Sequence, residues 1–184
     1  MSCGWSGACL SEDRAFEAFS LTVGAADRNH GYEPVEDTYL VRIGARRGWF
    51  DGERSGLWRW RGFWEFEAGY WRWDDERIRP EGGEELAEVA ATPVFRLERT
   101  SGYESGARPF VEGAVGVHLI SETLVSSRDM SSHFHFGSHV GAGWYFGRND
   151  RYELALHIQH LSNAGLKEPN PGINFVLLKF TVRP

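Results

Sequence analysis

The sequence lacks the features that mark the common helical, cysteine-rich and nucleic-acid-binding classes. Its 184 residues contain no apolar run long enough for a transmembrane helix. Its two cysteines, Cys3 and Cys9, both lie near the start, where a disulfide could brace only a terminal loop. Its net charge of −6 argues against nonspecific binding to polyanions, so we expect no nucleic-acid partner.

Aromatic residues and glycine are frequent: 14% of the chain is aromatic, with eight tryptophans, and 22 residues are glycine. Such a composition suits β-structure better than a helical bundle. Apolar and polar residues alternate with period two in recurrent runs, which is the pattern of strands with two different faces. The pattern predicts eight strands, at residues 17–26, 37–50, 57–73, 84–98, 108–120, 133–146, 151–162 and 173–183.

The two faces of these strands differ sharply in polarity. In residues 57–73, Trp60 and Trp64 share one face, whereas Arg61 and Glu65 share the other. A membrane barrel turns its apolar face outward and keeps a polar interior, and tryptophan is enriched where its wall meets the membrane surface. We therefore predict an all-β fold, an eight-stranded antiparallel transmembrane β-barrel of the outer-membrane type. Charged residues expected to pair in its interior include Arg59, Arg61, Glu65, Glu67, Arg151 and Glu153.

Domain organisation and loop lengths fit this prediction. Residues 17–184 are expected to form one barrel domain, preceded by an extension at residues 1–16. The predicted connections alternate between long and short, as in barrels with long outside loops and short periplasmic turns. The first residues do not resemble a secretory signal, so an outer-membrane location implies a signal that was removed or a misassigned start. A soluble sandwich or lipocalin-like barrel is the alternative that alternation leaves open.

Candidate chemistry lies at the end of the seventh predicted strand. His160 and Ser162 are two residues apart, so they point to the same side of a strand and continue its apolar face. An imidazole can take the proton of a serine hydroxyl and make it a nucleophile. Asn174, on the last predicted strand, is expected beside them across a hairpin, where its side-chain oxygen could orient the imidazole.

The stretch HLSNAGLKEPNPGI, residues 160–173, resembles the motif of the PagL-type lipid A 3-O-deacylase family. Weaker similarity runs through residues 92–95 and 108–117, so the resemblance extends from about Gly44 to the end. It implies an outer-membrane barrel, able to form a homodimer, that hydrolyses the ester of the 3-O-acyl chain of lipid A. Lipid A, as part of lipopolysaccharide, and outer-membrane lipids are then the expected partners, and neither a cofactor nor a metal is implied.

The resemblance also implies roles for individual residues. His160 would be the general base and Ser162 the nucleophile, while the oxyanion hole would consist of Asn163, Ala164 and Gly165. The family has a glutamate where this sequence has Asn174, which can orient the imidazole but supplies no negative charge. Asn174 should therefore leave a weaker base or require another acid, for which the candidate nearest in sequence is Glu168.

Two other interpretations stay open at this point. A non-catalytic outer-membrane barrel for lipid binding or adhesion would explain the missing carboxylate at Asn174. His133, His135 and His139 share one face of a predicted strand, and we interpret them as polar residues of the interior rather than as metal ligands.

Overall fold

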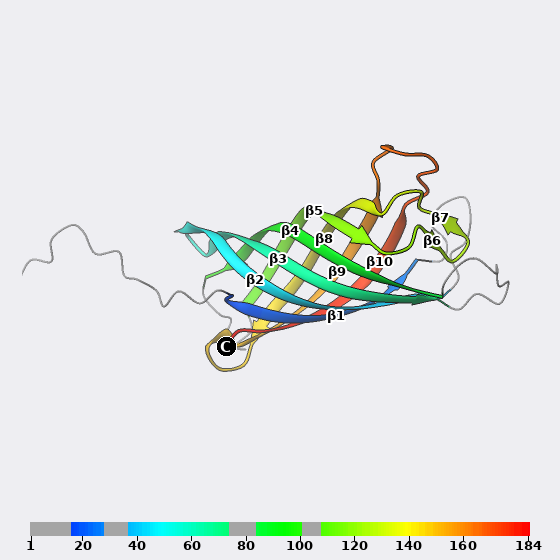
Figure 1. Cartoon of the computed structure of the whole chain (residues 1–184). Coiled ribbons are helices and arrows are strands. Elements are labelled where there is room, and N and C mark those ends of the chain that lie inside the picture. Colours follow the sequence, from blue (N-terminus) through cyan, green and yellow to red (C-terminus); the bar gives the residue numbers. More distant parts are fainter. Residues whose placement is uncertain (1–15, 28–36, 74–83, 101–107) are drawn as a thin grey trace, which may run out of the picture.

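The computed structural model describes residues 16–27, 37–73, 84–100 and 108–184 (Figure 1). Apart from Phe16, the predicted extension at residues 1–16 lies outside this part of the chain, as do the predicted loops at 28–36 and 74–83. The long strands are β1 (Ala18–Ala26), β2 (Thr38–Ser55), β3 (Trp58–Trp73), β4 (Glu85–Arg99), β5 (Arg108–Ile120), β8 (Phe134–Phe146), β9 (Tyr152–Ser162) and β10 (Ile173–Val182). Shorter elements are β6 (Leu124–Val125), β7 (Arg128–Asp129) and the 3-10 helix η1 (Arg148–Asp150).

The long strands form a closed barrel in the order β1, β10, β9, β8, β5, β4, β3, β2. Every neighbouring pair is antiparallel, and β1 closes the ring by pairing with β2 on one side and with β10 on the other. Closure leaves no sheet edge with unpaired backbone groups, as the hydrocarbon core of a membrane requires. All eight predicted strands are confirmed, and β2 extends five residues past the predicted end, to Ser55.

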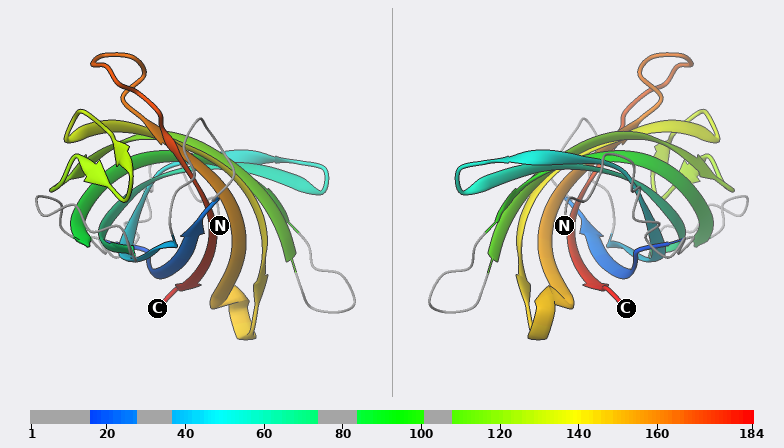
Figure 2. Two further views of the ribbon diagram at one scale, coloured as in Figure 1. Left: turned by 90° about the vertical axis from the view of Figure 1, so that its right-hand side faces the viewer. Right: turned by 90° about the vertical axis from the view of Figure 1, so that its left-hand side faces the viewer.

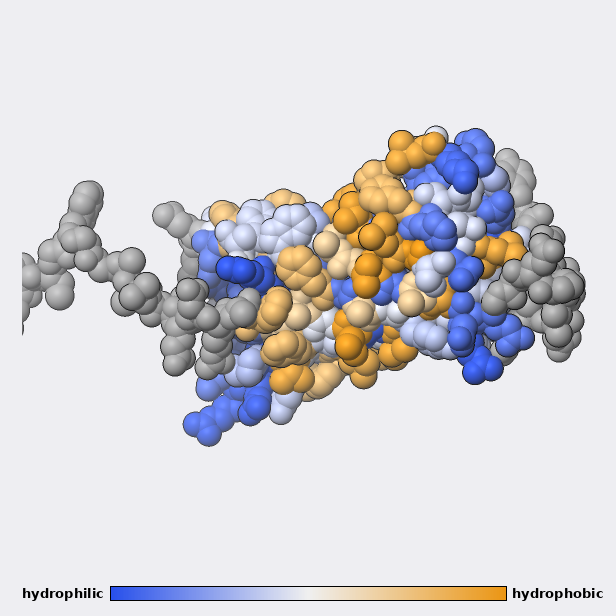
Figure 3. Space-filling view, viewed as in Figure 1, coloured by the Kyte–Doolittle hydropathy of each residue, from blue (hydrophilic) through white to orange (hydrophobic). Residues whose placement is uncertain are grey.

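The outer and inner faces of the barrel have opposite character. Apolar side chains on the outside are highly exposed, such as Ile43 at 65%, Val140 at 65% and Ile158 at 62%. On the face of the barrel seen in Figure 3, apolar residues form a band across the middle, with hydrophilic residues toward both ends. The interior holds buried charged side chains, such as Arg42 at 1%, Arg96 at 1% and Glu153 at 1%. A soluble lipocalin-like barrel would have the reverse arrangement, so the fold is a membrane barrel of the outer-membrane type.

Helices contribute little to the described part of the chain. No helix among the described residues is long and apolar enough to span a membrane.

Part of the interior is filled by buried charges, called here the ion-pair network. Arg96 donates to Glu112 at 2.6 Å and to Glu153 at 2.8 Å, and Arg46 donates to the same Glu153 at 2.9 Å. The predicted polar interior is confirmed, but Arg151 is exposed just before β9 and takes no part in it. The members of the network are Arg42, Arg46, Glu65, Glu67, Glu88, Arg96, Glu98, Glu112, Glu153 and Lys179.

At one end of the barrel the interior is apolar. This cluster, called here the apolar cap, includes Val125 and Met130 from the connection between β5 and β8. That connection and residues 163–172 lie at the same end, called here the site end, opposite η1 (Figures 1 and 2). The cap consists of Leu40, Trp71, Trp73, Leu86, Ile120, Val125, Met130, Leu161, Ile173, Phe175 and Leu177.

Candidate active site

The predicted catalytic residues come together on the outer surface at the site end. His160 and Ser162 lie at the end of β9, on either side of Leu161, which points inward and is fully buried. Asn174, near the start of β10, is the direct cross-strand partner of His160. The His160 side chain is exposed, and Ser162 and Asn174 are partly exposed. Strand parity therefore places the three polar groups on the face that meets lipid, as predicted.

A hydrogen bond fixes the orientation of the His160 ring. His160 Nδ1 lies 2.6 Å from Asn174 Oδ1. An amide oxygen can only accept, so Nδ1 carries the proton and Nε2 is left with a lone pair that can act as a base. Glu168 is exposed, and no hydrogen bond joins it to His160 in the described chain. The hydrogen bond to His160 thus supports the predicted orienting role of Asn174. No corresponding contact among the described residues supports a role for the Glu168 carboxylate beside His160.

Gly172 forms the other boundary of the His160 ring. A Cβ atom at this position would lie 2.7 Å from His160 Cε1 and 3.2 Å from Nε2. Gly172 also has φ +62°, a conformation that favours glycine. The imidazole is therefore held between the Asn174 side chain and the Gly172 backbone, and only glycine fits this position without displacing the ring.

Ser162 lies close to His160 but is not hydrogen-bonded to it. Residues two apart on a strand have Cα atoms roughly 6.5–7 Å apart, which side chains can span. Among the described residues, the His160 side chain is hydrogen-bonded to Asn174 and not to Ser162. Such bonds are often long in the free enzyme and tighten with substrate. The cross-strand neighbour of Ser162 is Phe136 on β8, which gives the serine an apolar flank on the lipid-facing side.

The residues of the predicted oxyanion hole lie in a loop that is held by its own hydrogen bonds. The Asn163 N–H donates to Asn170 Oδ1 at 3.0 Å, and its side chain, fully buried, donates to the Lys167 carbonyl at 2.7 Å. Asn163 Oδ1 in turn accepts the Gly165 N–H at 2.9 Å. Asn163 and Gly165 thus use these donors to hold the loop together. Among the predicted three residues, Ala164, exposed and at φ +55°, has the N–H that no described residue accepts.

Of the three histidines predicted to lie in the interior, His135 and His139 are buried there and His133 is not. His133 is exposed and precedes β8, whereas His139 points into the barrel, where one ligand atom each of His139, His157 and Glu112 lie within 4.8 Å of one another. These are the described residues that could hold a metal ion. Glu112 Oε1 lies 2.6 Å from His157 Nε2, and its Oε2 accepts from Arg96. Glu112 belongs to the ion-pair network and the two histidines lie beside it, so the three residues are inside the barrel, away from the lipid-facing site.

Residues outside the motif also shape the site. Arg128, on β7, is buried and donates to the Gly172 carbonyl at 2.7 Å. Ser131 donates to the Lys167 carbonyl at 3.1 Å, and the Asn163 side chain donates to Ser131 Oγ at 3.0 Å. The local sequence gives only one relevant signal, the serine pair 126–127, which is typical of a turn between two short strands.

The closed ring of strands and the apolar outer face define a membrane barrel of the outer-membrane type. A histidine, a serine and an asparagine lie together on its lipid-facing surface, and these are the groups of a hydrolase site. The model of the family lipid A 3-O-deacylase (PagL) matches residues 37–183. The chain belongs to this family and is an outer-membrane β-barrel.

Known proteins similar to this chain are consistent with that membership. The chain is 34% identical over 117 residues to lipid A deacylase PagL of Bordetella bronchiseptica, and the match covers 64% of this chain and 59% of that protein. It is 33% identical over 124 residues to lipid A deacylase PagL of Pseudomonas aeruginosa, covering 66% of this chain and 64% of that protein. The matches thus span less than two thirds of these relatives. A crystal structure of the outer membrane enzyme PagL superimposes with TM-score 0.72 at 27% identity, covering 91% of this chain and 99% of that one.

Proposed function

We propose that this barrel is a serine esterase that removes the ester-linked 3-O-acyl chain of lipid A in the outer leaflet of the outer membrane. The observation that carries the proposal is the hydrogen bond of 2.6 Å between His160 Nδ1 and Asn174 Oδ1, made on the lipid-facing surface two residues from Ser162. It leaves Nε2 as the base on the side of the molecule that lipid A can reach. Family membership supplies the substrate class.

The reaction follows from the groups in place. Nε2 of His160 takes the Ser162 proton while Ser162 Oγ forms a bond to the ester carbonyl carbon. The carbonyl oxygen becomes negative, and the Ala164 N–H is the available donor toward that charge. The sugar oxygen then leaves with the proton from His160. Water hydrolyses the acyl-serine by the same steps, which releases the fatty acid and restores Ser162.

Substrate reaches this site laterally. The interior at the site end is filled by the apolar cap, so the ester has to approach from outside. Next to the site, Ile158 and Val176 are exposed on the outer face at 62% and 49%. An acyl chain lying in the membrane would contact these side chains at little cost, because both surfaces are apolar. The ester of a membrane-embedded lipid therefore comes to the rim without leaving the bilayer.

The deciding experiment is mass spectrometry of lipid A from cells that express the wild type, Ser162→Ala or Ser138→Ala. Ser138 is the matched control because it lies outward on β8, directly across from His160. We expect the wild type and Ser138→Ala to remove one 3-O-acyl chain and Ser162→Ala to remove none. Loss of the chain from the wild type and from Ser162→Ala alike would rule out Ser162 as the nucleophile, and no loss from the wild type would rule out the activity.

A non-catalytic barrel for lipid binding is the second candidate function. It is favoured by the amide at Asn174 and by the lack of a hydrogen bond between Ser162 and His160 in the described chain. It predicts no hydrolysis even of short p-nitrophenyl esters, so turnover that depends on Ser162 would exclude it. The homodimer implied by the family resemblance stays a prediction, which the mass of the detergent-solubilised barrel tests.

A further inference from the structure

The hairpin formed by β6 and β7 lies beneath the strand ends that carry the candidate active site. Val125 and Met130 from this connection belong to the same buried cluster as Leu161 and Ile173. Leu161 points inward between His160 and Ser162, and its cross-strand partner is Ile173, which precedes Asn174. The polar site outside and the hairpin inside are thus attached to the two sides of the same pair of strands.

Hydrogen bonds join this hairpin to the loop after β9. The guanidinium of Arg128 is 2% exposed and donates through Nη1 to the Gly172 carbonyl at 2.7 Å. Hydrogen bonds from a charged donor are shorter and stronger than those between neutral groups. In the middle of the loop, Ser131 Oγ donates to the Lys167 carbonyl at 3.1 Å. The loop is therefore held at its middle and at its end by residues from a separate connection.

The bond to Gly172 acts at the residue that bounds the His160 ring. The Gly172 Cα faces the Cε1 and Nε2 edge of the imidazole, so closely that an added Cβ would be 2.7 Å from Cε1. Asn174 holds the opposite edge through Nδ1. A shift of the Gly172 backbone would change the position of Nε2, the atom that has to accept the Ser162 proton. The carbonyl that Arg128 holds belongs to that same residue.

We propose that Arg128 is a positioning residue for the esterase reaction: it fixes the Gly172 backbone and thereby keeps His160 Nε2 aimed for proton transfer from Ser162. The expected effect on kcat rests on the proposed function. The expected effect on the orientation of the His160 ring does not. Arg128 itself touches no reacting atom. Its hydrogen bond to the Gly172 carbonyl acts beside the imidazole, so loss of this bond should change the rate of chemistry rather than the affinity for substrate.

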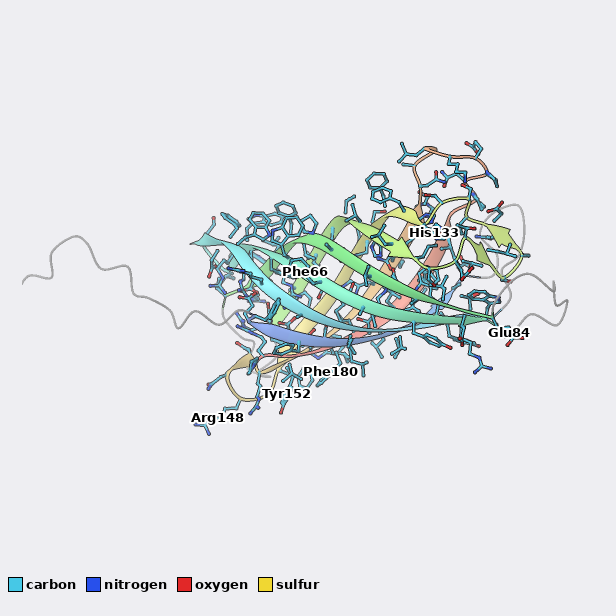
Figure 4. All side chains as sticks on the ribbon, in the orientation of Figure 1. Phe66, Glu84, His133, Arg148, Tyr152 and Phe180 are labelled. Carbon is cyan, nitrogen blue, oxygen red and sulfur yellow. The ribbon has the colours of Figure 1, made fainter. Side chains whose placement is uncertain are left out.

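The kinetic test compares Arg128→Met and Arg128→Lys with Arg148→Met in the full barrel folded in detergent. Arg148 is exposed on η1, far from the site end (Figure 4). We expect Arg128→Met to lower kcat for a p-nitrophenyl ester by about tenfold to a hundredfold with KM unchanged, as expected for misplacing a catalytic group. Arg128→Lys should restore part of kcat because an ammonium group can donate to the same carbonyl. Arg148→Met should match the wild type.

Folding and ring orientation are measured separately, so that the outcome does not depend on activity. Heat-modifiable migration on gels identifies samples in which the barrel is closed. In such samples, 15N NMR of labelled histidine, with the His160 signals assigned by their loss in His160→Gln, reports which ring nitrogen carries the proton. We expect a single Nδ1–H form in the wild type and a mixture in Arg128→Met.

The two hypotheses can fail independently. His160 signals or a kcat value unchanged by Arg128→Met in a closed barrel would overturn the positioning role. If the wild type has no esterase activity but Arg128→Met still changes the His160 signals, the positioning role stands and the proposed function is wrong.

Discussion

The two parts of the barrel interior are built on opposite principles. The ion-pair network is directional: Arg96 bridges Glu112 and Glu153 and also lies over the Phe110 ring at 3.7 Å. The apolar cap is filled by large side chains such as Trp71 and Phe175, whose rings meet edge to face, and it touches the network where Trp71 Nε1 donates to Glu88 at 2.7 Å. The candidate active site lies outside the apolar part.

This difference indicates a division of labour. Charges buried in the network require their specific partners, so they fix which strands face one another inside the ring. Apolar side chains accept any neighbours of suitable shape, and the cap can therefore take in a hairpin from a connecting loop. Through this hairpin the site end acquires supports such as Arg128, which strands alone could not supply. Substitutions in the two parts should have correspondingly different consequences.

The largest loss of stability is expected in the network, from Arg96→Met. The change leaves Glu112 and Glu153 buried with one partner fewer, and breaking a buried ion pair on one side costs about 3–5 kcal/mol. Urea unfolding in detergent, followed by heat-modifiable migration, measures the change. Arg148→Met is the control, since Arg148 is exposed. A loss as small as that of the control would mean that the network contributes little to stability.

A smaller loss of stability, but a clear loss of activity, is expected in the cap from Leu161→Ala. Removing a buried leucine side chain costs about 2–5 kcal/mol, and here the space opens between the strand positions of His160 and Ser162. Val94→Ala, at a buried position in a separate small cluster, is the control. We expect both variants to lose stability and only Leu161→Ala to lose ester turnover in the folded state. Equal turnover in the two variants would contradict the role given to the cap.

Asn174→Glu introduces a charge at the rim above the cap. A carboxylate would stabilise the His160 imidazolium that forms in the reaction, which the amide cannot do. We expect kcat to rise about tenfold, the factor that corresponds to ~1.4 kcal/mol of transition-state stabilisation. Initial rates on a p-nitrophenyl ester give the answer, with Asn174→Ala expected to be slower than the wild type. Unchanged rates in both variants would mean that position 174 does not act on His160.

The smallest effect is expected from the ion pair between Arg61 and Glu17. Its atoms are 3.2 Å apart, but the Glu17 side chain is 36% exposed, unlike the carboxylates of the network. Glu17→Gln should cost less than about 1 kcal/mol, as for other exposed pairs, and the cost should shrink as salt is added. Urea unfolding at low and high salt tests this. A large, salt-independent loss would place this pair with the buried network.

Much of the fold could be predicted because a strand with one face in lipid and one in a polar interior must alternate. Because of this alternation, all eight long strands could be predicted from the sequence. The prediction that His160, Ser162 and Asn174 share the outer face followed from the same pattern. The β6–β7 hairpin has only two residues in each strand, too few for a period to be visible. Its role depends on contacts between two loops, which no local pattern encodes.

The same limit applies to single residues at the ends of strands. The resemblance implies that Asn163 helps to stabilise an oxyanion, and no local pattern shows that its buried side chain also ties the loop by donating to the Lys167 carbonyl and to Ser131 Oγ. Arg151 was expected inside because it alternates with Glu153, yet β9 begins one residue later, at Tyr152. A residue at the boundary of a regular element does not obey the alternation of that element.

The pairing of β10 with β1 has a consequence for when the protein can act. Asn174 lies on the strand whose other neighbour is the first strand of the barrel. His160 receives its orienting partner across the β9–β10 hairpin, while the β1–β10 pairing closes the ring on the other edge of the same strand. Under the proposed function, a chain in which β9 and β10 are not yet paired would carry every side chain needed for ester cleavage and still lack the geometry that orients them.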